Sequence, residues 1–234
     1  GVQLGLFFLA VLPTTISSAV VLVGQAEGNI PGAIFNTVLA NLAGVLIVPL
    51  WMGWFQQQLL ATGIDLWPIL QKLILLLLLP FAIGHAARGW TPGSAAARIR
   101  SITRGISQGV IVFIVYAAFA TSFSKGTWSE IDPGIMWQIV GATLAMLGAA
   151  TALVWINSRL GFRKAEDRIA AFFVGSQKSL AVGMPYSVAL FAQLSSSDDP
   201  TLSHSIVILP MLLFHPLQLF LAGFCLRIRA RLFE

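Results

Sequence analysis

A lysine in the middle of an apolar stretch constrains this chain most strongly. The segment IAAFFVGSQKSLAVGMPYSVAL, Ile169–Leu190, is long and apolar enough to cross a bilayer, yet it carries Lys178 at its centre. A lysine at that depth costs about 2.5–3.5 kcal/mol on insertion scales, so it normally faces a partner or a cavity. Gly175, Gly183 and Pro185 predict a helix that is locally unwound around it. Because open backbone inside a membrane must be covered by protein or water, the segment predicts a transport site.

The composition is that of an integral membrane protein. Hydrophobic residues make up 57% of the chain and charged residues only 10%, against about 25% charged residues in a soluble domain. The net charge of +5 lies in short loops, which indicates membrane topology and not nucleic-acid binding. A single cysteine, Cys225, excludes a disulfide framework. No basic region precedes the first apolar segment, so we expect no signal peptide, and we expect a fragment that lacks upstream helices.

About seven apolar runs have the length of a transmembrane helix. We expect spans over Leu4–Gly24, Pro31–Phe55, Leu66–Ala87, Gly105–Phe123, Gly134–Asn157, Ile169–Leu190 and Leu202–Leu226. Arginine and lysine gather in every second connection and in the C-terminal tail, while the loops between them carry Asp and Glu. This alternation predicts a multi-pass protein of the plasma membrane, the inner membrane in a bacterium, with a cytoplasmic C-terminus.

Polar side chains at bilayer depth mark three candidate binding segments. The first segment is interrupted at Pro13, beside the hydroxyls of Thr14, Thr15, Ser17 and Ser18. These hydroxyls either bind a ligand or bond back to their own helix. In the second segment, Asn36 and Asn41 either bridge helices or coordinate a cation. Around the central lysine, the polar residues Ser176, Gln177 and Ser179 either bind a ligand or bond to neighbouring helices.

Several roles are possible for Lys178. It is either a fixed cation that stands in for a bound sodium ion and attracts an anionic substrate, or a desolvated amine that exchanges a coupling proton. The structural alternative is a lysine that pairs with a carbonyl at a helix end. The histidines His85, His204 and His215 lack metal-ligand spacing, which favours packing or interfacial roles. Because the chain has no nucleophile elbow, phosphate loop or paired carboxylates, we do not expect an enzyme.

The two ends of the chain follow a similar plan. Each pairs an interrupted segment with a proline-containing one, and SSAV at Ser17–Val20 corresponds to KSLAV at Lys178–Val182. Interrupted segments in corresponding positions of two halves indicate a transporter site at a repeat interface. The pattern predicts an inverted repeat of five helices, in which Leu4–Gly24 is the fourth helix and Ile169–Leu190 the ninth.

Several motifs together resemble one family. LPTTISSAVVL (Leu12–Leu22), GN (Gly28–Asn29), FNTVLANLAGVLIVPL (Phe35–Leu50) and GSQKSLAVGMP (Gly175–Pro185) resemble the bile acid:sodium symporter superfamily. The chain is most similar to its bile-acid-symporter-like branch, which contains the vertebrate solute carrier family 10 member 7 type. The resemblance implies an all-α inverted-repeat secondary transporter of ten helices, with two discontinuous helices that cross near the midplane. It also implies sodium-coupled transport of organic anions.

The resemblance also implies a division into domains. Residues 1–55 would supply helices four and five of a core domain, and residues 66–123 would be helices six and seven of a panel domain. Residues 134–226 would supply core helices eight to ten. Residues 227–234 would form a cytoplasmic tail.

Carried over residue by residue, the sodium site is only partly retained. Gln177 stands where the family has a glutamine that helps to bind sodium, and Ser18 is the second candidate ligand. Phe173, however, stands at the position of a glutamate shared by two sodium sites, and Ala19 replaces an asparagine. A sodium ion here would rest on hydroxyl, amide and carbonyl oxygens without a compensating charge.

We therefore expect a secondary transporter of a small organic anion that works by alternating access. Sodium, as a coupling ion, is the sole cofactor considered. The expected partners are the lipid bilayer and the anion, without nucleic acid, and the oligomeric state stays open. The alternatives are a proton-coupled or sodium-independent carrier, and a membrane regulator of ion homeostasis, notably of calcium, with no substrate of its own.

Overall fold

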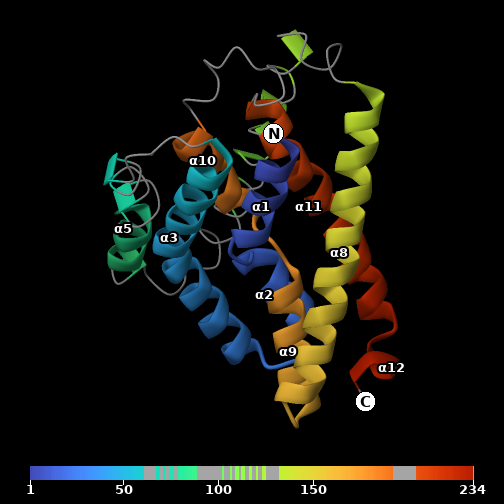
Figure 1. Ribbon diagram of the computed structural model, residues 1–234. Coiled ribbons are helices and arrows are strands. Elements are labelled where there is room, and N and C mark those ends of the chain that lie inside the picture. The colour runs from blue at the N-terminus through green and yellow to red at the C-terminus, as the bar shows by residue number, and fades with distance from the viewer. Residues whose placement is uncertain are drawn as a thin grey trace.

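The protein is a bundle of helices. The computed structural model describes residues 1–60, 79–88, 132–191 and 204–233, with scattered residues between 67 and 124. Within this part of the chain the elements are all helical, which confirms the all-α membrane fold class. They are α1 (Val2–Val11), α2 (Ile16–Gln25), α3 (Ile30–Leu60), α5 (Leu79–Arg88), α8 (Pro133–Gly161), α9 (Ala165–Ser176), α10 (Leu180–Phe191), α11 (His204–Arg227) and α12 (Arg229–Phe233) (Figure 1).

Three continuous helices are long and apolar enough to cross a membrane. They are α3 over Ile30–Gln57, α8 over Pro133–Gly161 and α11 over Ile206–Arg227. The pair α1 and α2 meets the same test as one broken span, bent by 57°. The predicted span Leu66–Ala87 contains α5 in its C-terminal part. The rest of this span and Gly105–Phe123 are described only at scattered residues, so the predicted panel domain stays a prediction.

Both predicted interruptions are confirmed as discontinuous helices. Residues 12–15 separate α1 from α2, and residues 177–179 separate α9 from α10. Pro13 has no backbone N–H and cannot continue the helix before it. On the other side, Ser179 caps α10, because its Oγ accepts a hydrogen bond from the backbone N–H of Val182 at 3.2 Å. Each expected span is thus two half-helices joined by a short extended break.

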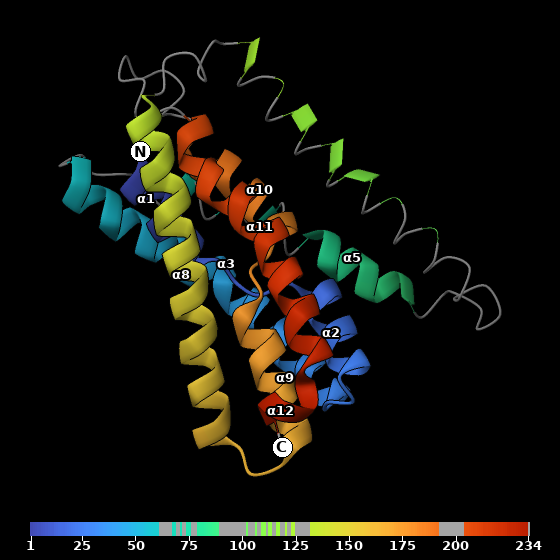
Figure 2. The same cartoon turned by 90° about the vertical axis from the view of Figure 1, so that its right-hand side faces the viewer.

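Most buried apolar side chains form two cores, one on each side of these breaks, and a small third cluster of Ile139, Ile206 and Leu209 lies between α8 and α11. The upper core of Figure 1 lies among α1, α3, α10 and α11 and includes Phe8, Tyr186 and Phe214. The lower core lies among α2, α9, α11 and α12. Phe172 and Phe173 pack there in an edge-to-face pair with ring centroids 5.2 Å apart. Figure 2 shows the long helix α8 running alongside both halves. The breaks therefore lie between two apolar clusters.

Several predicted boundaries are wrong by a few residues. The segment expected to begin at Ile169 begins at Ala165, because Glu166 and Asp167 in the first turn of α9 suit the positive end of a helix. Helix α3 continues from the predicted end at Phe55 to Leu60. The hydrophobic pattern predicted that these helices would end where the apolar run ends, whereas the helices continue into the polar residues beside it.

The last residues of the chain fold back onto the bundle. Helix α12 follows α11 after a single residue, and Arg229 donates to the backbone carbonyl of Gln25 and pairs with Glu27. The Nε1–H of Trp155 donates to the carbonyl of Leu232 at 3.3 Å. Phe233 is only 2% exposed. The segment predicted as a cytoplasmic tail is therefore packed against the ends of α2, α8 and α9.

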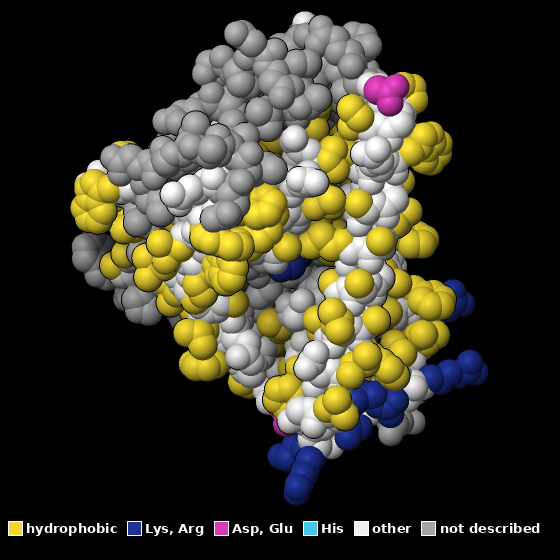
Figure 3. Space-filling view, in the orientation of Figure 1, with side chains coloured by type: hydrophobic (Ala, Val, Ile, Leu, Met, Phe, Trp, Pro, Cys, Tyr) yellow, Lys and Arg dark blue, Asp and Glu magenta, His cyan; other side chains and the backbone are white. Residues whose placement is uncertain are grey.

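Basic side chains gather at the end of the bundle that holds the C-terminus. Figure 3 shows them at the lower end of the molecule, with an acidic side chain at the upper end and apolar side chains between. The described basic residues of this end are Arg159, Arg163, Lys164, Arg168, Arg227, Arg229 and Arg231. They come from the α8–α9 connection with its flanking turns and from the C-terminal segment, and they outnumber the acidic Glu27, Glu166 and Asp167 at the same end. The described part of the chain is thus consistent with the excess of basic residues predicted for these two segments.

A close helix contact gives a first prediction. A Cβ on Gly5 would lie 2.4 Å from the backbone carbonyl oxygen of Val207, so α1 packs against α11 only because this residue has no side chain. We expect Gly5→Ala to lower the melting temperature, since overpacking costs about 1–3 kcal/mol and exceeds the gain in helix propensity of about 1 kcal/mol. Gly148→Ala is the control, because nothing described lies within 4 Å of its Cβ position. Equal melting temperatures for the two variants would contradict this packing.

Candidate functional site

The two helix breaks contact each other directly. The backbone N–H of Ser179 donates to the carbonyl of Pro13 at 3.0 Å. The hydroxyl of Thr14 donates to the carbonyl of Val174, near the end of α9, at 2.6 Å. These bonds satisfy backbone groups that the broken helices leave open. The candidate residues around Pro13 and those around Lys178 are therefore brought together at one crossing point.

The ammonium of Lys178 lies at the C-terminal end of α1. Its Nζ donates to the carbonyls of Ala10 and Leu12, each at 2.8 Å. These carbonyls belong to the last turn of a half-helix, where the helix dipole is negative and a cation is stabilised. The lysine is half-buried. The structure thus shows the carbonyl pairing that was the structural alternative for Lys178.

A residue that the sequence analysis missed holds the backbone of Lys178. The Gln218 side chain, on α11, accepts from the Lys178 N–H at 2.6 Å and donates to the Lys178 carbonyl at 2.7 Å. Its Nε2 also lies 2.9 Å from Nδ1 of His215. A carboxamide in the middle of an apolar run was the available signal, the same signal that singled out Asn41. His215 makes a polar contact here, in addition to the packing or interfacial role expected for it.

The two asparagines of α3 differ in their roles. Asn41 donates from Nδ2 to the carbonyl of Thr14 at 2.9 Å and to the carbonyl of Thr37 at 2.7 Å. It therefore bridges α3 to the first break, as the helix-bridging interpretation requires. Asn36 is exposed and donates to the carbonyl of Gly32, one turn earlier in its own helix.

The remaining candidates fall into two groups. Thr15 and Ser176 are buried beside the breaks, whereas Ser17 is exposed on α2. Ser18 and Gln177 each keep a buried oxygen, Oγ and Oε1, that has no hydrogen-bond partner among the described residues. These two oxygens are the ones that the family resemblance would assign to sodium.

An open groove of about 530 Å³ runs along the crossing point. Its lining comes from both breaks, α3, α9 and the start of the α8–α9 connection. Thr14, Asn36, Gln177 and Lys178 supply its polar groups. The other lining residues are Leu12, Pro13, Leu39, Ala40, Ala43, Phe162, Ala171, Val174 and Gly175. In Figure 3 a basic side chain is recessed among apolar ones at mid-height. A largely apolar wall with a few polar groups is typical of a small-molecule site.

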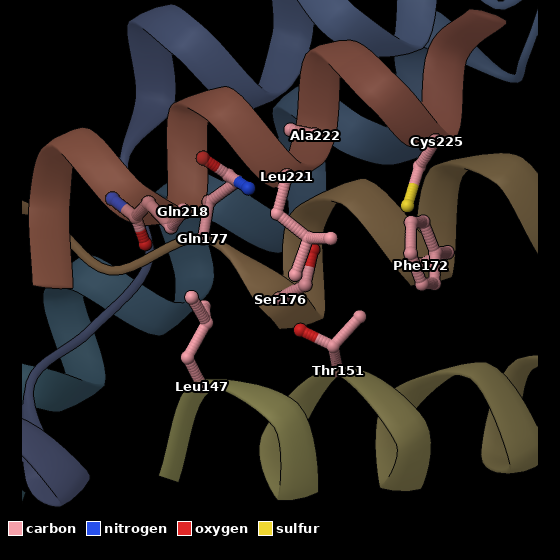
Figure 4. Close-up of a pocket in the computed structure, with 9 residues that line it drawn as sticks. All are labelled: Leu147, Thr151, Phe172, Ser176, Gln177, Gln218, Leu221, Ala222 and Cys225. Carbon is pink, nitrogen blue, oxygen red and sulfur yellow. The ribbon is translucent and has the colours of Figure 1, made fainter. Parts of the chain in front are cut away.

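A second, very small cavity adjoins Gln177. It measures about 10 Å³, close to the space that one water needs. In Figure 4 the side chains of Thr151, Ser176 and Gln177 face this space from α8, α9 and the second break. Gln177 lines both the groove and this cavity.

Two broken helices whose breaks contact each other are typical of the core of a secondary transporter. Residues 1–230 match the profile of the SBF-like CPA transporter family, and the chain belongs to this family. The family and the apolar helices make it an integral membrane protein.

Its relatives have longer chains. An uncharacterized protein of Pseudomonas aeruginosa is 35% identical over 217 residues, which are 92% of this chain and 62% of that protein. YfeH of Escherichia coli, provisionally named a symporter, is 32% identical over 92% of this chain and 61% of its own length. Sodium/bile acid cotransporter 7 of Xenopus tropicalis is 28% identical over 94% of this chain and 61% of its own. The chain thus spans about three fifths of each relative.

Proposed function

We propose that this chain is the substrate-binding part of a secondary active transporter for small organic anions, working by alternating access. One observation carries the proposal: the Lys178 ammonium is fixed at the crossing of two broken helices, beside an open groove. A cation is retained at that depth at a considerable cost in free energy, which favours a function for it. The family membership and the symporter names of two relatives support transport.

The electrostatics of the crossing favour an anion. The C-terminal ends of α1 and α9 each carry about half a negative charge, and the N-terminal ends of α2 and α10 about half a positive charge. These four partial charges roughly cancel. No Asp or Glu of the described residues lines the groove. The full positive charge of Lys178 therefore remains and attracts an anionic group to the break.

The groove supports the chemical class of the substrate. Its wall is mainly aliphatic, and its polar groups gather where the two breaks meet. A molecule with an apolar body and one anionic group matches this division, since the body would lie along α3 and α9 with the anion near Lys178. In this proposal Thr14, Asn36 and Gln177 orient the substrate, while Thr15, Ser17, Ser18, Ser176, Asn41 and Ser179 shape the breaks.

Sodium matches this site poorly. The buried oxygens of Ser18 and Gln177 are suitable ligands in kind, but no carboxylate of the described residues accompanies them. Phe173, at the position of the family's glutamate, is fully buried in the lower core. The carbonyls at the end of α1 are already paired with Lys178. We therefore propose a sodium-independent mechanism in which the lysine stands in for the coupling cation.

The proposal extends to the topology. Each broken helix is followed by a helix whose carboxamide side chain binds to the break, Asn41 in α3 and Gln218 in α11. This correspondence supports an inverted repeat. The basic end of the bundle supports a cytoplasmic C-terminus.

Uptake into proteoliposomes tests the proposed function. The full-length protein is reconstituted and offered a panel of radiolabelled organic anions, taurocholate, a steroid sulfate and benzoate, in sodium chloride or choline chloride. We expect concentrative or exchange-driven uptake of at least one anion, equal in both salts. Uptake in sodium alone would restore the sodium-coupled symporter, and uptake driven by a pH gradient would favour the proton-coupled carrier. No uptake of any anion would favour the regulator of ion homeostasis.

A further inference from the structure

The side chain of Gln218 forms hydrogen bonds with both backbone polar groups of Lys178 in the second break, as the backbone of a neighbouring β-strand would. Lys178 lies between α9 and α10, where its N–H and C=O have no partner within a helix. Gln218 pairs with both groups, at 2.6 Å and 2.7 Å, and is 1% exposed. Figure 4 shows it projecting from α11 beside Gln177. A single buried carboxamide therefore satisfies both backbone polar groups of the lysine.

The orientation of this carboxamide is determined by its partners. The Lys178 N–H is a donor, so the oxygen Oε1 must face it, and the amine Nε2 must then face the Lys178 carbonyl. If the carboxamide were rotated by 180°, Nε2 would face the Lys178 N–H and Oε1 would face the Lys178 carbonyl, so that donor would face donor and acceptor would face acceptor. The second hydrogen of Nε2 therefore points at Nδ1 of His215, 2.9 Å away.

The same reasoning fixes the state of the histidine. Because Gln218 Nε2 is a donor in both of its contacts, Nδ1 of His215 must accept and cannot carry a hydrogen. For this contact to be a hydrogen bond, His215 has to be a neutral imidazole with its hydrogen on Nε2, the state that the proposal below assigns to it. It lies one helical turn before Gln218 in α11, where residues three apart are neighbours.

We propose that Gln218 is the positioning residue of the second break, and that neutral His215 holds its carboxamide in the orientation that the break requires. Gln218 fixes the peptide of Lys178, and with it the point from which the lysine side chain extends to Ala10 and Leu12. Without this contact the Lys178 backbone would lose both partners, and the ammonium would leave the end of α1 more often. The inference rests on the role proposed above for Lys178.

Chemical labelling of the lysine tests the positioning role without a substrate. The full-length protein is treated with acetic anhydride, and the acetylation rate of Lys178 is measured by peptide mass spectrometry relative to exposed Lys164. We expect Gln218→Leu to raise the relative rate about fivefold, the change that one net hydrogen bond of typical strength produces. Gln56→Leu is the matched control, since Gln56 is equally buried on α3, away from the second break. Equal rates in the two variants would overturn the proposal.

The histidine offers a second pair of variants and an independent measurement. His215→Asn keeps an acceptor near the position of Nδ1 and should label like the wild type, whereas His215→Leu should label like Gln218→Leu. In ¹⁵N-histidine spectra of the wild-type protein, with His215 assigned from the Asn variant, Nδ1 should lack a proton. A protonated Nδ1 would overturn the proposal even if Gln218→Leu failed to fold. Because labelling does not require transport, the failure of the proposed function would leave these outcomes interpretable.

Discussion

Replacing Lys178 with methionine should reduce organic-anion uptake by about 10- to 100-fold, since charge-assisted hydrogen bonds contribute about 1.5–3 kcal/mol. Methionine keeps the length of an apolar side chain and removes only the charged end. The substrate then loses the cation that attracts it. The carbonyls of Ala10 and Leu12 lose the donor that now satisfies them. Uptake into proteoliposomes at matched protein density measures the effect.

The same variant has a second readout. With the ammonium gone, the negative end of α1 presents two free carbonyl oxygens, which are suitable sodium ligands. We expect Lys178→Met to melt at a higher temperature in sodium chloride than in choline chloride, because an ion that binds the folded state stabilises it, and we expect the wild type to show no difference. Lys164→Met, whose side chain is 74% exposed in the wild type, should change neither uptake nor the response to sodium. Undiminished uptake in Lys178→Met would refute the role given to the lysine.

A glutamate in place of Phe173 should destabilise the protein severely. This ring is fully buried and packs against Phe172 and Phe233, with centroids 5.2 Å and 6.3 Å away. A carboxylate in that cluster would lose its hydration without gaining a partner, and an unpaired buried charge costs about 3–5 kcal/mol. We expect a large fall in melting temperature, or loss of the folded protein. The melting temperature of Phe173→Leu should fall much less, because the side chain stays apolar.

This variant also tests the proposal that the chain does not bind sodium. Position 173 lies in the apolar cluster that α12 closes, so restoring the glutamate should not restore a sodium site. If Phe173→Glu folded normally and melted at a higher temperature in sodium chloride than in choline chloride, the carboxylate would have reached the ion. Sodium coupling would then need only one substitution, and the poor match described above would be wrong.

The sequence predicted where the two helices break, but only in part why. Pro13 ends α1 as expected. Gly175 and Gly183, read as signs of unwinding, lie inside α9 and α10. They serve close packing instead, because a Cβ at Gly183 would lie 2.4 Å from the sulfur of Met211. The second break lies at residues 177–179 between them and depends on hydrogen bonds from other elements. A local pattern cannot reveal such bonds.

The candidate residues were predicted better than their partners. Thr14, Gln177, Lys178 and Asn41 do meet at one crossing. The ammonium of the lysine, however, contacts backbone carbonyls more than 160 positions away in the chain. Every residue type has a carbonyl, so no sequence signal marks which ones will accept. Gln218 was missed for a related reason, since one amide in an apolar helix does not show which backbone it will reach.

The hydrogen bonds between the two breaks have a consequence for motion. The N–H of Ser179 is bonded to Pro13, and the hydroxyl of Thr14 to Val174, so each break supplies what the other lacks. Pulling one break away would leave unpaired backbone in the middle of the membrane, which is costly there. Any movement that opens the groove first to one side and then to the other must therefore leave this junction intact. In the alternating access proposed above, we expect the four half-helices to turn together as one rigid body, with the surrounding helices moving against it.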